Sequence, residues 1–223
     1  EYATLTTLKF VDCKLMEKSA IVLNVNNVQN EKPEIKALLD EINNNPILNE
    51  PIAIAKTKFE NHEELGCMLT DALREISEAD FAFQNTGGIR IKHLKKGPIT
   101  VKDVYEIDPF ENDVVMYQMT GEQVKKFIIN SYKKNGGHPS YVSGMTYEVT
   151  DDGNRLDVFI RPDKGNYGKT TIYKVAFNSY MATTVNIESV DEGRSMFQTS
   201  EEMLVEFLRR HKTVDYQGVV RTK

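Results

Sequence analysis

The stretch that most constrains the fold is residues 80–90, which read DFAFQNTGGIR. Its two phenylalanines alternate with smaller residues, and this alternation predicts a strand that enters a hydrophobic core. Gly87 and Gly88 then end the strand, because adjacent glycines allow positive φ angles and leave bare backbone N–H groups that a ligand can approach. Arg90 follows where the alternation resumes, and its guanidinium fits a phosphate or a carboxylate. The same residues also fit an ordinary glycine turn followed by a surface arginine.

The composition limits the possible partners. The chain has 223 residues, of which 40% are hydrophobic and 27% are charged, so it can bury a normal core. The net charge is −5 and the basic residues are scattered, whereas a duplex-binding protein usually has a basic stripe, so we expect no nucleic-acid partner. No apolar run approaches the roughly 20 residues of a membrane span, so we expect none. The chain begins at Glu1 without a signal peptide, and we interpret it as a mature or excised fragment.

The cysteines and histidines form no metal-binding motif. Cys13 and Cys67 both lie in apolar contexts, which predicts two buried free thiols rather than a disulfide. The histidines are separated from one another along the chain: His62, His93, His138 and His211. Since structural and catalytic metal sites need clustered ligands, we expect no metal on this chain.

The rest of the chain mixes helices and strands without a regular alternation of the two. Alternating apolar residues predict strands at residues 4–27 (a pair), 51–59, 80–91, 114–119, 141–149, 155–160, 171–180 and 219–220. Capping residues ahead of helical apolar spacing predict helices that begin near Pro33, Asn61, Thr100, Thr120 and Thr199. Residues 183–196 are predicted to form a long loop. The pattern predicts an α+β fold of mixed sheets with packed helices, in which residues 1–50 lead into a domain of residues 51–223.

Seven sequence blocks between residues 60 and 182 carry a family resemblance. In order they are ELGCMLTDALR, NTGGIR, GPIT, DPFEN, MTGEQV, YVSGMTYEV and YKVAFNSYMA. Their order and spacing resemble the C-terminal, substrate-binding domain of the 5′-nucleotidase family. The resemblance implies the fold of that domain and a role in nucleotide catabolism, as part of a hydrolase that removes phosphate from nucleotides.

The resemblance also implies what this chain lacks. In the family, an N-terminal metallophosphatase domain holds two divalent metal ions and the catalytic residues, and the C-terminal domain binds the nucleoside. We therefore expect no catalytic residue and no cofactor here, with the two metal ions on the missing N-terminal domain. The expected partners are that domain and a nucleotide or nucleoside. This fragment alone is predicted to be inactive, and the whole protein is expected to be secreted, periplasmic or on the cell surface.

Site residues follow from the matched motifs. Asn85 corresponds to the family's substrate-binding asparagine, and Arg90 to its phosphate-binding arginine. Gly88 corresponds to the glycine whose backbone lies against the ligand, and Gly87 completes the turn. Phe110 corresponds to the first of two aromatic residues that sandwich the base, although its local sequence equally fits core packing.

The chain departs from the family pattern after residue 182. The family has a GGDGF loop that carries the second aromatic residue and then a ribose-binding aspartate, whereas this chain has TTVNIESVDEGRSMF. Phe197 is near enough to be the second stacking residue, and it also fits a hydrophobic lead-in to the last helix. Asp191 is a candidate for the ribose contact.

Two further functions stay open. The same domain type serves 2′,3′-cyclic nucleotide phosphodiesterases and nucleotide-sugar hydrolases, so the whole protein could act on those esters. The altered segment 183–197 also fits a non-catalytic surface binding module that has kept the fold.

Overall fold

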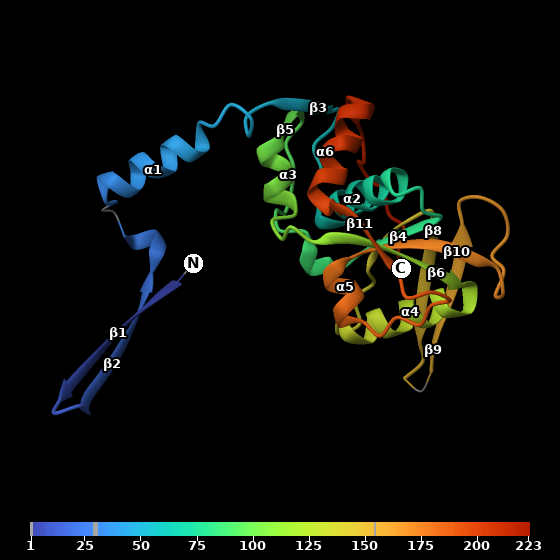
Figure 1. Ribbon diagram of the computed structural model, residues 1–223. Coiled ribbons are helices and arrows are strands. Elements are labelled where there is room, and N and C mark those ends of the chain that lie inside the picture. Colours follow the sequence, from blue (N-terminus) through green and yellow to red (C-terminus); the bar gives the residue numbers. More distant parts are fainter. Residues whose placement is uncertain (1, 29–30, 154) are drawn as a thin grey trace. The chain divides into compact units, whose positions relative to one another are not determined.

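The computed structural model describes residues 2–28, 31–153 and 155–223 (Figure 1). The chain divides into two compact units, Glu1–Pro46 and Ile47–Lys223. The second unit contains both hydrophobic cores and all the residues singled out as candidate site residues. Across the described ranges, no helix is long and apolar enough to cross a membrane.

The first unit is a β-hairpin followed by a helix, as predicted. Its strands are antiparallel, with Leu5 opposite Ile21, and none of its described residues is buried. Cys13 lies in the hairpin turn and is exposed, so the prediction of a buried thiol is wrong for this residue: an uncovered turn has no core to enter. Cys67, in the second unit, is buried as predicted. The elements are β1 (Tyr2–Val11), β2 (Lys14–Asn24), η1 (Val25–Asn27) and α1 (Pro33–Asn43).

A five-stranded mixed sheet lies at the centre of the second unit, with the strand order β11-β6-β10-β4-β7. β10 runs parallel to β4, with Val175 opposite Phe81, and antiparallel to β6. The strands are β4 (Phe81–Gln84), β6 (Asp113–Thr120), β7 (Tyr141–Ser143), β10 (Ile172–Asn178) and β11 (Arg194–Thr199).

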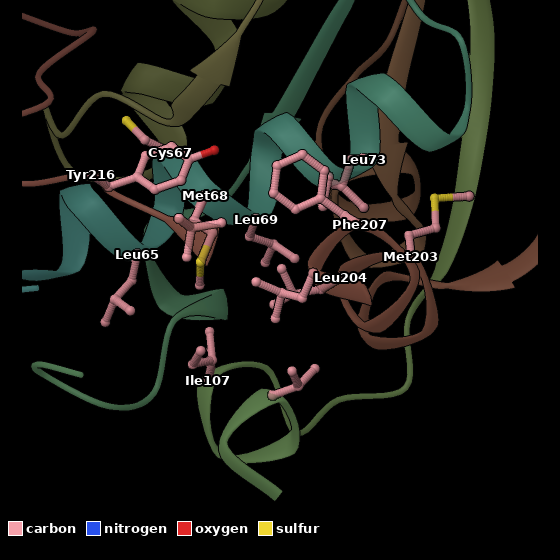
Figure 2. Close-up of a cluster of buried hydrophobic side chains, with 14 of the residues drawn as sticks. Leu65, Cys67, Met68, Leu69, Leu73, Ile107, Met203, Leu204, Phe207 and Tyr216 are labelled. Atoms are coloured by element: carbon pink, nitrogen blue, oxygen red, sulfur yellow. The ribbon is translucent and has the colours of Figure 1, made fainter. Parts of the chain in front are cut away.

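Alternating strand residues of this sheet enter two different cores. Ala82 and Ala176 face the core formed with α2, α3 and α6, and their small side chains let these helices approach the sheet closely. Phe83 and Phe177 enter the opposite core, where their rings stack with centroids 5.7 Å apart. The first core is shown in Figure 2, in which side chains of α2 and α6 meet. Its helices are α2 (His62–Ile76), α3 (Val101–Ile107) and α6 (Ser200–His211).

The second core is covered by two helices and a hairpin. Phe127 of α4 contacts the Phe177 ring edge-on at 4.5 Å, and Met181 of α5 is also fully buried there. Tyr147 and Val158 bring the predicted hairpin β8–β9 onto the same core. The elements are α4 (Gly121–Lys134), α5 (Ser179–Thr184), β8 (Met145–Asp151) and β9 (Leu156–Pro162).

A small three-stranded sheet completes the second unit at the side of α6. Its order is β12-β3-β5, in which β3 pairs parallel with β12 and antiparallel with β5. The strands are β3 (Pro51–Ala55), β5 (Gly97–Thr100) and β12 (Thr213–Val214). The packed helices and mixed sheets confirm the predicted α+β class.

Some predicted boundaries differ from the structure. The strand predicted to run to residue 180 ends at Asn178, because the Asn178 side chain accepts the Met181 N–H and starts α5 there. Residues 89–91 and 219–220 form no strand. The predicted loop 183–196 ends earlier than expected, since β11 begins at Arg194 and pairs with β6.

Candidate functional site

The NTGGIR segment forms a tight 3-10 turn directly after β4. The turn, η2 (Thr86–Gly88), is closed by a hydrogen bond from the Gly88 N–H to the Asn85 carbonyl oxygen at 3.0 Å. A Cβ atom on Gly88 would lie 2.1 Å from Gln84 Nε2, so any other residue would force the buried Gln84 side chain to move. Glycine serves close approach here rather than a positive φ angle.

A buried amide network sets the orientation of Asn85. The Asn178 amide donates to Gln84 Oε1 at 2.8 Å and to Asn85 Oδ1 at 2.9 Å. The Asn178 oxygen is already occupied as the cap of α5, so its Nδ2 group must be the donor in both bonds. Because the Asn85 oxygen accepts from Asn178, the group that Asn85 has left for a ligand is its NH2 donor.

Phe110 lies on a loop between α3 and β6 that is tied down on both sides. The Asn112 carbonyl oxygen accepts the Ser200 N–H at 2.9 Å, and Asn112 Oδ1 accepts from Ser179 Oγ at 3.0 Å. The Phe110 side chain is 47% exposed, so it does not pack in the core. The loop therefore presents an aromatic ring to solvent from a fixed backbone.

Arg90 lies against this ring. Its backbone N–H donates to the Ile107 carbonyl oxygen at 2.9 Å, which joins the turn after β4 to the end of α3. The Arg90 guanidinium carbon is 5.7 Å from the centroid of the Phe110 ring, within the range of a cation–π contact. Throughout the described part of the chain, no carboxylate forms an ion pair with Arg90. Its charge is thus available to an anion.

These residues surround a pocket of about 300 Å³. Its lining residues are Asn85, Gly87, Gly88, Phe110, Asn112 and Tyr180. Four of them are sequence-predicted site residues. Arg90, a fifth, does not line the pocket but contacts the Phe110 ring that does. The sequence reasoning missed Asn112 and Tyr180. Asn112 stands in the quoted DPFEN block, and Tyr180 was assigned to a strand, whereas it lies on α5 with 48% of its surface exposed.

Phe197 is placed differently from the other predicted site residues. It lies in β11, at an irregularity of the pairing with β6 between Ser195 and Thr199, and is not among the residues that line the pocket. The side chain is 91% exposed, which does not fit a hydrophobic lead-in to α6. Its φ angle of 56° is uncommon for a bulky residue, and its N–H donates to Ser195 Oγ at 3.0 Å. An exposed aromatic residue held in this backbone conformation is a candidate for binding.

Asp191, the candidate ribose contact, is used within the protein. Its Oδ1 accepts the Gln118 N–H at 2.9 Å and its Oδ2 accepts from Gln118 Nε2 at 3.3 Å. The Val190 N–H returns a bond to the Gln118 carbonyl oxygen at 2.7 Å. Asp191 therefore fastens the segment before β11 to β6.

One titratable group next to the pocket is strongly perturbed. Burial raises the pKa of the Asp108 carboxyl to about 7, and the negative charge of Glu201 adds to this increase. Hydrogen bonds from Ser200 and from the Phe110 N–H act in the opposite direction. Within the described residues, no group of three or more His, Cys, Asp or Glu side chains is placed to hold a metal ion.

The comparisons with known proteins agree with this architecture. The family model for the 5′-nucleotidase C-terminal domain matches residues 44–186, which is more than half of the chain. The α+β domain therefore has the fold of a 5′-nucleotidase C-terminal domain. This chain belongs to the 5′-nucleotidase C-terminal domain family, as its sequence blocks predicted.

Similar proteins include several phosphoesterases. The chain is 32% identical over 145 residues to Endonuclease YhcR of Bacillus subtilis, covering 62% of this chain and 12% of that protein. It is 30% identical over 140 residues to a 5′-nucleotidase of Vibrio parahaemolyticus, covering 56% of this chain and 25% of that protein. The chain thus spans at most about a quarter of the length of these two relatives.

A solved structure shows the same fold. The 5′-nucleotidase precursor of Thermus thermophilus superposes with a TM-score of 0.68 at 22% sequence identity, and the match covers 99% of this chain and 49% of that one. The NAD nucleotidase of Haemophilus influenzae gives a TM-score of 0.64 at 16% identity, covering 98% of this chain and 52% of that one.

Proposed function

We propose that the second unit is the substrate-binding domain of a metal-dependent 5′-nucleotidase and that it recognises the nucleoside part of a nucleotide. The observation that carries this proposal is the pocket beside η2, which is lined by a flat half-exposed ring and bare glycine backbone, with the Arg90 guanidinium against that ring. A flat ring suits a base, and a cation suits the phosphate.

The chemistry of each group supports a defined role. Phe110 offers its ring face for stacking, which is worth about 1–3 kcal/mol per base and tolerates any base. Tyr180, the other half-exposed ring of the pocket, is the candidate for the opposite face. The Asn85 NH2 group donates to an acceptor on the ligand, and Arg90 takes the phosphate.

The proposal includes a separate catalytic partner. A nucleotide hydrolase of this type requires metal ligands, so the two metal ions and the catalytic residues belong to an N-terminal metallophosphatase domain. The first unit supports such a partner, because the apolar stripe of α1 is about half exposed: Ile35, Leu38, Leu39 and Ile42. The name 5′-nucleotidase among the relatives favours a phosphomonoester hydrolase. The proposal includes a secreted, periplasmic or cell-surface location, which the family resemblance implies.

Calorimetric titration of the full chain with AMP and with adenosine tests the proposal. We expect AMP to bind more tightly than adenosine, because only AMP carries the phosphate for Arg90. Phe110→Ala should weaken AMP binding by about tenfold or more, which corresponds to the loss of one stacking face. Phe159→Ala is the matched control, since Phe159 is a similarly exposed phenylalanine on β9 that does not line the pocket.

Three results would contradict the proposal. If neither ligand produces heat with the wild-type chain, the chain does not bind nucleosides. If Phe110→Ala retains wild-type affinity, the ring is not a stacking face. Phosphate release from AMP by this chain in the presence of divalent cations would contradict the assignment of catalysis to another domain. The same titration on Phe197→Ala and Tyr180→Ala shows which of the two supplies the second ring.

A further inference from the structure

Two fully buried carboxyl groups lie beneath the Phe110 loop. Asp108 stands at the end of α3 and Glu201 in the first turn of α6, and neither has any exposed surface. Ser200 Oγ lies between them, 2.7 Å from Asp108 Oδ2 and 3.4 Å from Glu201 Oε2. Burying two acidic groups side by side is costly unless each makes compensating hydrogen bonds.

Two hydrogen bonds join the start of α6 to the loop. Glu201 Oε1 accepts the Glu111 N–H at 2.5 Å. The Ser200 N–H donates to the Asn112 carbonyl oxygen at 2.9 Å. Two consecutive loop residues, Glu111 and Asn112, are therefore fastened beside the pocket by the start of α6.

The backbone of the loop needs this support. Glu111 has a φ angle of 50°, a conformation that non-glycine residues adopt only when their surroundings enforce it. Without an acceptor for its N–H, the residue next to Phe110 would relax toward ordinary backbone angles. The direction of the Phe110 ring would change with it.

Ser200 and Glu201 are not occupied with capping their own helix. A capping box of Thr199 and Glu202 already does this, since Thr199 accepts the Glu202 N–H and the Glu202 carboxylate accepts the Thr199 N–H. The next two residues of the turn are thus free to serve the loop. A plain structural role at the helix start does not require a buried carboxylate.

We propose that Glu201 is a positioning residue for nucleoside binding, which together with the backbone N–H of Ser200 holds residues 111 and 112 so that Phe110 faces the pocket. This inference rests on the proposed function and deepens it, because it locates the control of the stacking ring outside the pocket. Neither residue lines the pocket itself.

The test compares Glu201→Ala, Glu201→Gln and Glu206→Ala in the full chain. Two quantities are measured: hydrogen exchange of the Glu111 amide by NMR without ligand, and AMP affinity by calorimetry. Glu201→Ala removes the acceptor, so exchange at Glu111 should rise and affinity should fall, each by about tenfold. Glutamine keeps an acceptor oxygen, so Glu201→Gln should restore both to within about threefold of wild type. Glu206→Ala, a carboxylate lost from the same helix away from the loop, should change neither quantity.

The outcomes separate this inference from the proposed function. Wild-type exchange at Glu111 in Glu201→Ala would overturn the inference, as would faster exchange with unchanged AMP affinity. If Glu201→Ala does not fold, Glu201→Asp, whose shorter side chain withdraws the acceptor from the Glu111 N–H, is judged by the same two measurements. If the wild-type chain binds no AMP, the proposed function is wrong and so is the role in nucleoside binding. Exchange at Glu111 then still decides whether Glu201 holds the loop.

Discussion

At the residue scale, the fold gives the Asp108 carboxyl a pH dependence that the protein's stability must reflect. Burial raises its pKa to about 7, above the value of about 4 in an unfolded chain. The folded protein therefore binds a proton here more tightly than the unfolded chain does. This favours folding below about pH 4, and the contribution is lost as the pH rises through 7.

Asp108→Asn is expected to remove the loss of stability that wild type shows as the pH rises, because an amide has no charge to bury. Relative to wild type, the variant should gain unfolding free energy between pH 5 and pH 8, by at most about 3 kcal/mol. Urea unfolding at both pH values measures the difference. The exposed carboxylate of Asp113, replaced in Asp113→Asn, provides the control and should show no such trend. An identical difference between Asp108→Asn and wild type at both pH values would contradict the prediction.

From the sequence, pocket residues could be named only where they belong to a recognisable motif. Asn85, Gly87, Gly88 and Phe110 were named from the sequence, and all four line one pocket. Glu201 was not, because its helix was recognised from a capping box and an apolar stripe. Whether a glutamate next to that stripe is exposed or buried depends on which loop lies over it, and this loop is 90 residues away along the chain.

At the element scale, local signals predicted the helices well and the strand ends less well. The capping boxes that begin at Thr100, Thr120 and Thr199 each form both of their reciprocal side chain–backbone hydrogen bonds. Asn61 caps α2 alone, since the Glu64 carboxylate accepts the Glu60 N–H instead of closing the box. The end of β10 was missed because an alternating pattern continues past Asn178, and only the cap on α5 ends it.

The close packing of Gly66 in α2 against β7 gives a test at this scale. A Cβ atom there would lie 2.2 Å from the Tyr141 ring of β7. Glycine to alanine in a helix normally stabilises by about 1 kcal/mol, but here the clash should make Gly66→Ala destabilising by about 1–3 kcal/mol.

A double-mutant cycle isolates the cause. In a Tyr141→Ala background the ring is absent, so adding Gly66→Ala should be neutral or stabilising. Chemical denaturation of the four proteins gives the coupling energy. Equal effects of Gly66→Ala in both backgrounds would show that the ring is not what the helix packs against.

At the scale of the whole molecule, the two units differ in what they can bury. The described residues of the first unit form a two-stranded hairpin and an 11-residue helix with no buried side chain. Both elements are marginal in water on their own. Both hydrophobic cores lie in the second unit, and their buried residues run from Ile52 to Tyr216.

Residues 47–223 are therefore expected to fold without the first unit. The segment just before β3 supports this boundary, because the Lys102 N–H donates to the Leu48 carbonyl oxygen at 2.8 Å and Arg209 pairs with Glu50 at 2.7 Å. A protein of residues 47–223 should melt within about 2 °C of the full chain in calorimetry, since no core contact is lost. A protein of residues 51–223, cut at the sequence-predicted boundary, loses both contacts and should melt lower.

A peptide of residues 1–46 should show little secondary structure by circular dichroism. If the 47–223 protein melts more than about 5 °C below the full chain, the first unit contributes to the stability of the second.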